Sequence, residues 1–342
     1  MSADVTTELP PEPPPDWSGD RPRRIEASPS PVDQVYRNSV RAIGALVLVI
    51  TGAIGVFLAI QSVPTLHHYG WSYFTQNQWN PESDVVGISA VLLGTAEVAL
   101  VASVIAFPLA LATALYISEY APDRIRSLLI TLVDLMAAVP SIVWGLLGRD
   151  FLEDKLIYFG HWMHQHLGFV AIFTVNTDPN AANWAQSSYI GSAFDAGVAV
   201  SFMIIPMAAA VMRQVFSLAP AAEREAAYAL GATRWGMIRS VVLPFGRGGI
   251  VGGTMLALGR ALGETIAVVL IISVAFDIKF RIFEIGTVTV SSLIAGRFGE
   301  ASSVQLSALL TAGFVLFLIT LLVNTVAAIV VSRSRSGVGT DA

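Results

Sequence analysis

Long runs of apolar residues alternate along this chain with shorter segments in which charged and polar residues gather. A helix needs about 20 residues to cross the hydrocarbon core of a bilayer, and six of the runs are long enough. They occupy residues 42–60, 87–117, 128–147, 192–215, 248–275 and 307–331. A further apolar segment, residues 169–175, is too short to span. The pattern predicts an all-α integral membrane protein with six transmembrane helices.

Composition also indicates a membrane protein, and it excludes cysteine chemistry. The 342 residues are 54% hydrophobic and only 13% charged, and the mean hydropathy is +0.65. These values lie well outside the range of soluble proteins. The chain contains no cysteine, which excludes disulfides and thiolate chemistry.

The chain divides by composition into four parts. Residues 1–39 are rich in proline and charge and predict a disordered tail, because such a segment cannot bury a core. Residues 40–86 predict the first transmembrane helix and an exterior loop. Residues 87–332 hold the other five spans, and residues 333–342 predict a second tail.

The distribution of positive charge predicts the orientation in the membrane. Six spans place both termini on the same side. If that side is the cytoplasm, the Lys and Arg residues of the exterior loops are only Arg149, Lys155, Lys279, Arg281 and Arg297. Because cytoplasmic loops carry an excess of Lys and Arg, we expect the N and C termini in the cytoplasm.

The polar segment between the fourth and fifth runs predicts a helical hairpin. Pro220 suits the start of a helix, and residues 221–230 are good helix formers. Gly231 can adopt the left-handed conformation that ends a helix and turns the chain. A second short helix, residues 233–242, is expected to stop at Pro244.

Residues 219–249, which contain this hairpin, carry a spaced set of small, charged and turn-forming residues. The set is Glu225, Ala226, Ala227, Gly231, Leu243 and Pro244, with Val241 where the pattern usually has isoleucine. This spacing resembles the EAA loop of permease subunits of ABC importers, a coupling helix that docks on the ATP-hydrolysing subunit. No G-x-x-x-x-G-K-[ST] motif for nucleotide phosphates is present, so ATP hydrolysis is expected in a separate chain.

The fifth apolar run contains two charges, Arg260 and Glu264. An arginine within the membrane is costly unless it faces water or a partner, which makes it a functional candidate. If the run is one helix, Glu264 lies on the same face, because it is four residues farther on. A guanidinium can hold a tetrahedral oxyanion with two parallel hydrogen bonds. The two residues therefore predict a substrate path, and a self-neutralising structural pair is the alternative.

Two other acids lie within apolar runs, Glu97 in the second and Asp134 in the third. Either one would pair with Arg260 or narrow the path, and the alternative that we favour is a hydrogen bond between helices. The histidines at 161, 164 and 166 have a spacing that permits metal binding. They lack acidic or thiolate neighbours, so we favour an interfacial amphipathic segment and expect neither a metal nor a cofactor.

Three stretches together resemble one family more narrowly. Residues 258–268, LGRALGETIAV, are similar to part of the phosphate-importer permeases of the Pst type, as are residues 137–145 and 117–122. The GETxAV form resembles the PstC-like subunit rather than its PstA-like partner. The resemblance covers about residues 87–331 and implies the type I ABC importer permease fold. It also implies that the two charges of the fifth run matter for transport.

The same resemblance implies a set of partners. These are a PstA-like second permease, two copies of a PstB-like ATP-binding subunit, an extracytoplasmic PstS-like phosphate-binding protein, phosphate and membrane lipid. No feature indicates nucleic acid.

The sequence thus predicts a multi-pass cell-membrane protein, the permease subunit of an ATP-driven phosphate importer, and no enzyme. Phosphonate, sulfate or molybdate is an alternative substrate, since similar donors bind all of these oxyanions. An ion-coupled secondary transporter, in which Glu97, Asp134 and Glu264 relay protons, is another alternative. The EAA-like loop argues against it, because such a transporter has no ATPase to dock. A membrane-embedded enzyme would need a nucleophile and a base, for which no motif is present.

Overall fold

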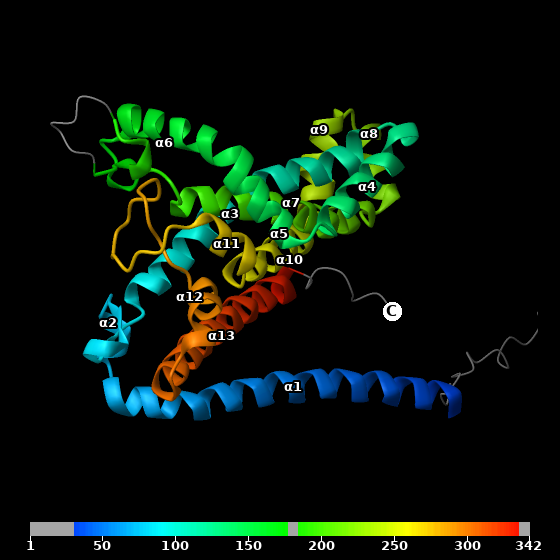
Figure 1. The fold of residues 1–342 in the computed structure, drawn as a ribbon. Helices are drawn as coiled ribbons and strands as arrows, with labels where there is room; N and C mark the ends of the chain where they lie inside the picture. Colours follow the sequence, from blue (N-terminus) through cyan, green and yellow to red (C-terminus); the bar gives the residue numbers. More distant parts are fainter. Residues whose placement is uncertain (1–30, 177–183, 335–342) are drawn as a thin grey trace, which may run out of the picture. The chain divides into compact units, whose positions relative to one another are not determined.

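The computed structural model describes residues 31–176 and 184–334 (Figure 1). It divides into two units, residues 1–53 and residues 54–342. Most of the predicted N-terminal tail and all but the start of the predicted C-terminal tail lie outside the described residues.

The described part of the first unit is the beginning of α1 (Pro31–Tyr69). The helix starts within the predicted tail, because a proline fits the first helical position and Asp33 lies in the first turn, where the helix dipole favours negative charge. Its apolar side chains, such as Ile43 and Leu48, are exposed. This is the pattern of a helix whose surroundings are hydrocarbon.

The second unit continues α1 and is almost entirely helical. Its short strands β1 (Trp79–Asn80) and β2 (Val85–Val86) pair antiparallel, with Trp79 opposite Val86. Its helices are α2 (Ser72–Thr75), α3 (Ser89–Leu115), α4 (Asp123–Ala137), α5 (Ser141–Leu147), α6 (Glu153–Leu167), α7 (Ala193–Ser217), α8 (Ala221–Ala229), α9 (Arg234–Met237), α10 (Leu243–Leu262), α11 (Ile266–Ile271), α12 (Val290–Arg297) and α13 (Ser303–Ser334). Three wide, π-helical turns follow α3, α5 and α9, at Tyr116–Tyr120, Gly148–Leu152 and Ile238–Val242.

The described residues contain five helices that are long and apolar enough to cross a membrane. They begin at Pro31, Ser89, Ala193, Arg234 and Ser303. A sixth span results if α4 and residues 141–167, which meet at a bend of 90°, cross as one. The prediction of an all-α, multi-span membrane fold is confirmed.

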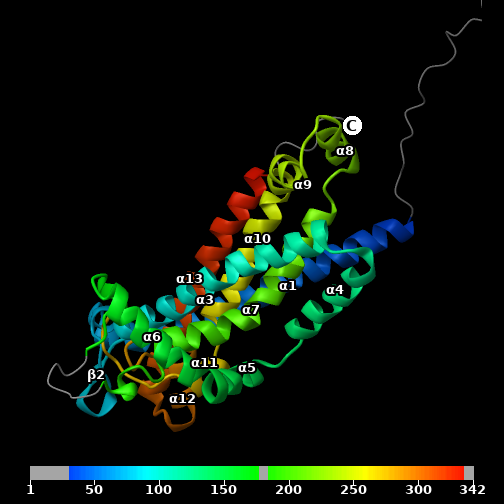
Figure 2. The ribbon, with the colours of Figure 1, turned by 90° about the horizontal axis from the view of Figure 1, so that it is seen from above.

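The centre of the second unit is a bundle of α3, α7 and α10, which lie side by side, with α13 against α10 (Figures 1 and 2). The helices contact through small residues. The buried alanines of α3 recur every three or four residues, at Ala99, Ala102, Ala106, Ala110 and Ala114. On α10, Gly246, Gly249 and Gly253 face α7, and a Cβ added at Gly253 would lie 3.1 Å from the backbone oxygen of Ala208. Small side chains permit this close approach. In the lipid bilayer, burying apolar side chains does not drive helices together, so close packing must do so.

The third apolar run is not the single straight helix that residues 128–147 predicted. It breaks after Ala137, and α5 starts at Ser141 in a new direction. Pro140 explains the break, because proline has no N–H to donate and disfavours helical geometry in the residue before it, Val139.

The fifth run also differs from its prediction, a span over residues 248–275. Its helix starts earlier, at Leu243, and ends at Leu262; after a three-residue link, α11 ends at Ile271. The chain then continues without regular structure up to α12. Backbone hydrogen bonds tie this segment to residues 188–191, including Ser273 N to Gly191 O at 3.1 Å and Ile285 N to Ser188 O at 2.7 Å.

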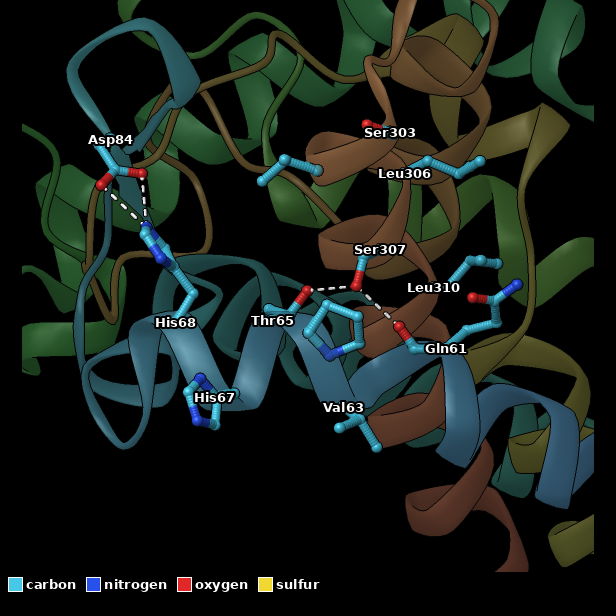
Figure 3. A pocket seen from close by; sticks show the side chains of 12 residues that line it. Gln61, Val63, Thr65, His67, His68, Asp84, Ser303, Leu306, Ser307 and Leu310 are labelled. Carbon is cyan, nitrogen blue, oxygen red and sulfur yellow. Dashed lines mark hydrogen bonds and ion pairs between the residues drawn. The ribbon is translucent and has the colours of Figure 1, made fainter.

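Within the second unit, the end of α1 is fastened to the start of α13 (Figure 3). The hydroxyl of Thr65 lies 2.7 Å from that of Ser307, which itself donates to the carbonyl oxygen of Gln61 at 2.7 Å. Nearby, His68 Nε2 lies 2.9 Å from a carboxylate oxygen of Asp84. The hydrogen bond from His68, and to a lesser extent the one from Tyr69, holds the pKa of Asp84 below its usual value. Except for Tyr69, these residues border a cavity of about 880 Å³.

The segment between α11 and α12 is organised around the carboxylate of Glu284. Its Oε2 accepts hydrogen bonds from Arg281 Nη1 at 2.8 Å and from Asn176 N at 3.1 Å, and its Oε1 lies 3.6 Å from Lys279 Nζ. Burial raises the pKa of Glu284, but these bonds and the charge of Lys279 together outweigh burial, so the pKa lies below its usual value.

Because the folded-state pKa of Glu284 is lowered, its contribution to stability is complete above the unfolded-state pKa and is lost as the pH falls through the folded-state value. We expect Glu284→Gln to reduce the free energy of unfolding at pH 7 by about 1–3 kcal/mol. The difference from the parent should shrink steadily below pH 4.5, the ordinary pKa of the group. Thermal unfolding of the purified chain in detergent at several pH values measures both effects. Glu82→Gln, at an exposed position, is the control, and an equal effect of the two substitutions would contradict the assignment.

Candidate functional site: the hairpin end and the Arg260 pocket

The predicted hairpin is present as α8 and α9, at one end of the bundle and away from α12 (Figure 2). Gly231 has φ +83°, the left-handed conformation that the sequence predicted. The last turn of α8 closes with hydrogen bonds from Leu230 N to Ala226 O at 3.1 Å and from Ala232 N to Ala227 O at 3.0 Å. The hydroxyl of Thr233 then caps α9 by accepting from Gly236 N at 3.1 Å. Local sequence therefore determines the turn without help from the bundle.

The prediction that the second helix of the hairpin stops at Pro244 is wrong. It passes through the wide turn Ile238–Val242 directly into α10, so helix is continuous from Arg234 to Leu262. In the wide turn Leu243 N donates to Ile238 O, five residues back. The extra residue in the turn and the absence of an N–H to satisfy at Pro244 let the helix accommodate a proline in its first turn.

The hairpin exposes both its motif residues and a group of large apolar side chains. Glu225, Ala226 and Gly231 are exposed, whereas Ala227 packs in part against the core. Leu230 is 89% exposed, and Trp235 and Tyr228 are also exposed. Sequence reasoning missed these three, although their place beside the predicted turn was a signal. Exposed apolar groups at a polar turn are typical of a protein contact surface.

Two arginines fasten the hairpin to the end of α3. Arg224 Nη1 lies 2.9 Å from Glu119 Oε2, and its Nη2 donates to the carbonyl oxygen of Phe216 at 2.6 Å. The Glu119 side chain is only 3% exposed. Arg234 lies over the ring of Tyr120, 5.2 Å from its centre. Both contacts fall on the segment 117–122, for which the sequence offered a family resemblance but no role.

A pocket of about 520 Å³ lies farther along α10 and contains the predicted path residues. It is lined by Met207 of α7, by Leu256, Gly259 and Arg260 of α10, by Gly263 and Glu264 of the link to α11, and by Thr320 and Asn324 of α13. Three helices and the link therefore meet around Arg260 and Glu264.

Arg260 and Glu264 share this pocket but not a helical face. The helix ends at Leu262, and Gly263 caps it, so the prediction of one continuous face is wrong. Glu264 is 8% exposed, and its Oε1 accepts from Ala267 N at 3.3 Å, at the start of α11. Arg260 is exposed, and its Nη2 lies 3.5 Å from Met203 Sδ. Among the described residues there is no ion pair between Arg260 and Glu264 or any other acid, which leaves the guanidinium fork open toward the pocket.

The other two predicted acids lie apart from Arg260. Asp134 on α4 forms an ion pair with Arg213 on α7, with 3.8 Å between Oδ1 and Nη2. Asp134 therefore forms an interhelical ion pair, and neither the predicted pairing with Arg260 nor the interhelical hydrogen bond is present among the described residues. Glu97 on α3 is partly buried, and its Oε1 has no hydrogen-bond partner among the described residues.

The histidines lie on α6, where His164 Nδ1 accepts from Val175 N at 3.1 Å and His161 Nδ1 lies 3.3 Å from the hydroxyl of Tyr189. Within residues 31–176 and 184–334, no three His, Asp, Glu or Cys side chains gather in a way that would hold a metal ion.

This chain is similar in sequence to a family of known membrane transport proteins. The model of the family "Binding-protein-dependent transport system inner membrane component" matches residues 106–336. The phosphate transport system permease protein PstC of Pasteurella multocida is 34% identical over 313 residues, 88% of this chain and 92% of that protein. PstC 2 of Mycobacterium tuberculosis is 35% identical over 310 residues, 89% and 93% of the two chains. The probable PstC of Methanocaldococcus jannaschii is 34% identical over 292 residues, 82% and 88%.

Solved structures share the fold at lower sequence identity. The MetNI methionine ABC transporter in an inward-facing conformation matches with a TM-score of 0.51 and 15% identity, covering 75% of this chain and 99% of that chain. A bacterial ABC transporter involved in the import of alginate matches with a TM-score of 0.50 and 16% identity, covering 88% and 99%. The predicted fold, that of a type I ABC importer permease, is confirmed.

The contact between Arg224 and Glu119 generates a stability prediction. Arg224→Met leaves a buried carboxylate without its partner, which typically costs about 3–5 kcal/mol. We expect the double variant Glu119→Gln/Arg224→Met to be more stable than Arg224→Met alone, because the unpaired charge is gone. Thermal unfolding of the purified chain measures this, with Arg239→Met on an exposed hairpin arginine as the control. If Arg224→Met and Arg239→Met unfold at the same temperature, the ion pair does not hold the hairpin.

Proposed function

Because the chain belongs to the family of binding-protein-dependent transport system inner membrane components, we propose that it is the permease subunit of an ATP-driven phosphate importer. The observation that carries the proposal is its similarity, over most of both chains, to curated phosphate transport system permeases. The chain is a multi-pass inner-membrane protein. It contributes a translocation path and contributes no covalent chemistry.

The hairpin is the part of the chain that fits an ATPase partner. It presents Glu225 and the small Ala226 beside a tight turn, flanked by the exposed side chains of Leu230 and Trp235. This combination suits a second protein that approaches the backbone closely and covers the apolar groups. In the proposed importer this chain pairs with a PstA-like permease and two PstB-like ATPases, and a PstS-like protein delivers phosphate from outside.

The Arg260 pocket is the part that fits phosphate. The unpaired guanidinium has parallel donors for two oxygens of a tetrahedral anion. The carboxylate of Glu264 lines the same pocket, and only its Oε1 has a hydrogen-bond partner among the described residues. Phosphate at neutral pH carries a P–OH group that can donate a hydrogen bond to a carboxylate. Sulfate and molybdate carry no such proton, so the Glu264 carboxylate would repel them. The pocket thus favours phosphate, or a phosphonate, over the other oxyanions.

An ion-coupled secondary transporter is the second candidate. It requires acids that exchange protons along one route, but Glu97 and Asp134 do not line the pocket that Glu264 lines, and Asp134 is held by Arg213. It also leaves the exposed hairpin without a purpose. We therefore keep the ATP-driven importer.

The coupling role predicts the effect of two hairpin substitutions. Gly231→Val forces a β-branched residue into a left-handed conformation, although its side chain would meet no atom within 4 Å. Glu225→Arg reverses the exposed charge. Both variants should reach the membrane and lose at least about tenfold in phosphate-dependent ATP hydrolysis, a loss of about 1.4 kcal/mol in coupling. Gly299→Val, at a glycine without positive φ and equally free of neighbours, is the control. Normal hydrolysis and copurification of both variants with the ATPase would remove the docking assignment.

The path role predicts a graded series at Arg260. Lysine keeps the charge but lacks the planar fork, so Arg260→Lys should retain part of the phosphate uptake, whereas Arg260→Gln should abolish it. Arg247→Gln, on the same helix, is the control.

The double variant Arg260→Gln/Glu264→Gln separates the two readings of this site. A self-neutralising pair predicts that the double neutral variant transports nearly as well as the parent. A path residue predicts no recovery. Uptake of labelled phosphate by cells that lack their own importer makes the measurement, and near-parental uptake would contradict the path role.

A further inference from the structure

Asn324 of α13 is a polar side chain whose position is not explained by a hydrogen bond to its own helix backbone. Three threonines of α13 donate to their own helix: Thr311 to Ser307 O, Thr320 to Phe317 O and Thr325 to Leu321 O, at 2.7, 2.9 and 2.7 Å. The carboxamide of Asn324 makes no hydrogen bond to any described residue. Asn324 is exposed in a stretch of helix that is mostly apolar, and an amide that faces hydrocarbon without a partner costs about 2 kcal/mol or more, so its presence there indicates a function.

Asn324 lies at the wall of the Arg260 pocket. Its Oδ1 is 3.6 Å from the point where a Cβ would stand on Gly259, the residue before Arg260. The absent side chain at Gly259 therefore leaves the amide next to the backbone of α10. Because Thr320 lines the same pocket one turn earlier, α13 presents a polar edge to the pocket in an otherwise apolar stretch.

We propose that Asn324 is a substrate-contacting residue of the translocation path and donates its N–H groups to phosphate oxygens beside Arg260. The inference rests on the proposed phosphate transport. A tetrahedral oxyanion has more acceptor sites than one guanidinium can satisfy, and an amide supplies further donors without adding charge. A neutral donor suits a transport site, where binding must be favourable enough for entry and weak enough for release.

A structural role for Asn324 would be a hydrogen bond to a helix of a neighbouring subunit. Such a bond would determine how much importer assembles, whereas a substrate contact determines how fast each assembled importer works. The two roles therefore predict different results when the uptake rate is divided by the amount of assembled complex.

The experiment uses the complete importer, expressed in cells that lack their own, with labelled inorganic phosphate as the probe. Asn324→Leu keeps the approximate size and removes the donors, and Asn324→Ser retains one smaller donor. Thr325→Val, at the next residue on the same helix, removes a hydroxyl that only its own backbone uses, and it is the matched control. Quantified copurification with the ATPase gives the amount of assembled importer.

We expect Asn324→Leu to lower the uptake rate per assembled importer by about tenfold or more, as for the loss of hydrogen bonds to a charged group. Asn324→Ser should be intermediate, and Thr325→Val should stay within about twofold of the parent. The proposal is overturned if Asn324→Leu and Asn324→Ser both stay within about twofold per assembled importer, even if less importer assembles. If the parent importer itself takes up no phosphate, it is the proposed function that fails, and the two failures are thereby distinguished.

Discussion

The contact between α10 and α7 is the constraint on which the rest of the second unit depends. Gly246 brings the α10 backbone against Phe216, Gly249 against Val215, and Gly253 against Ala208 and Met212, where larger side chains would collide. In hydrocarbon no hydrophobic effect drives helices together, so close packing of small residues must supply the attraction. Because α10 carries the return of the hairpin at one end and Arg260 at the other, this contact positions both candidate sites relative to the bundle.

The all-α, multi-span character of the chain followed from the sequence because a bilayer requires long, continuous apolar helices. The hairpin followed as well, because its geometry is local. Gly231 is the residue that tolerates a positive φ, and the Thr233 hydroxyl caps the next helix within three residues. Neither feature needs information from elsewhere in the chain.

Helix ends inside the membrane and contacts between distant residues did not follow. Apolar composition continues through Pro140 and past Gly263, so hydropathy cannot reveal either break, and the second break separates Glu264 from the face of Arg260. The pairing of Asp134 with Arg213 depends on how α4 packs against α7. Asn324 was missed because one amide hardly changes the apolar character of a long run, although it is the single Asn in residues 307–331 and that run has no charged residue.

The wide turn at Ile238–Val242 gives the hairpin and the pocket a fixed rotational relation. Helix is continuous from Arg234 to Leu262, which spans about 40 Å at 1.5 Å per residue. A π-helical turn holds one residue more than an α-helical turn, and one residue corresponds to about 100° of rotation around the axis. The turn therefore determines the direction, around the helix axis, in which α9 points relative to Arg260. A rotation of α9 about the helix axis is therefore coupled to the position of Arg260 through the turn Ile238–Val242.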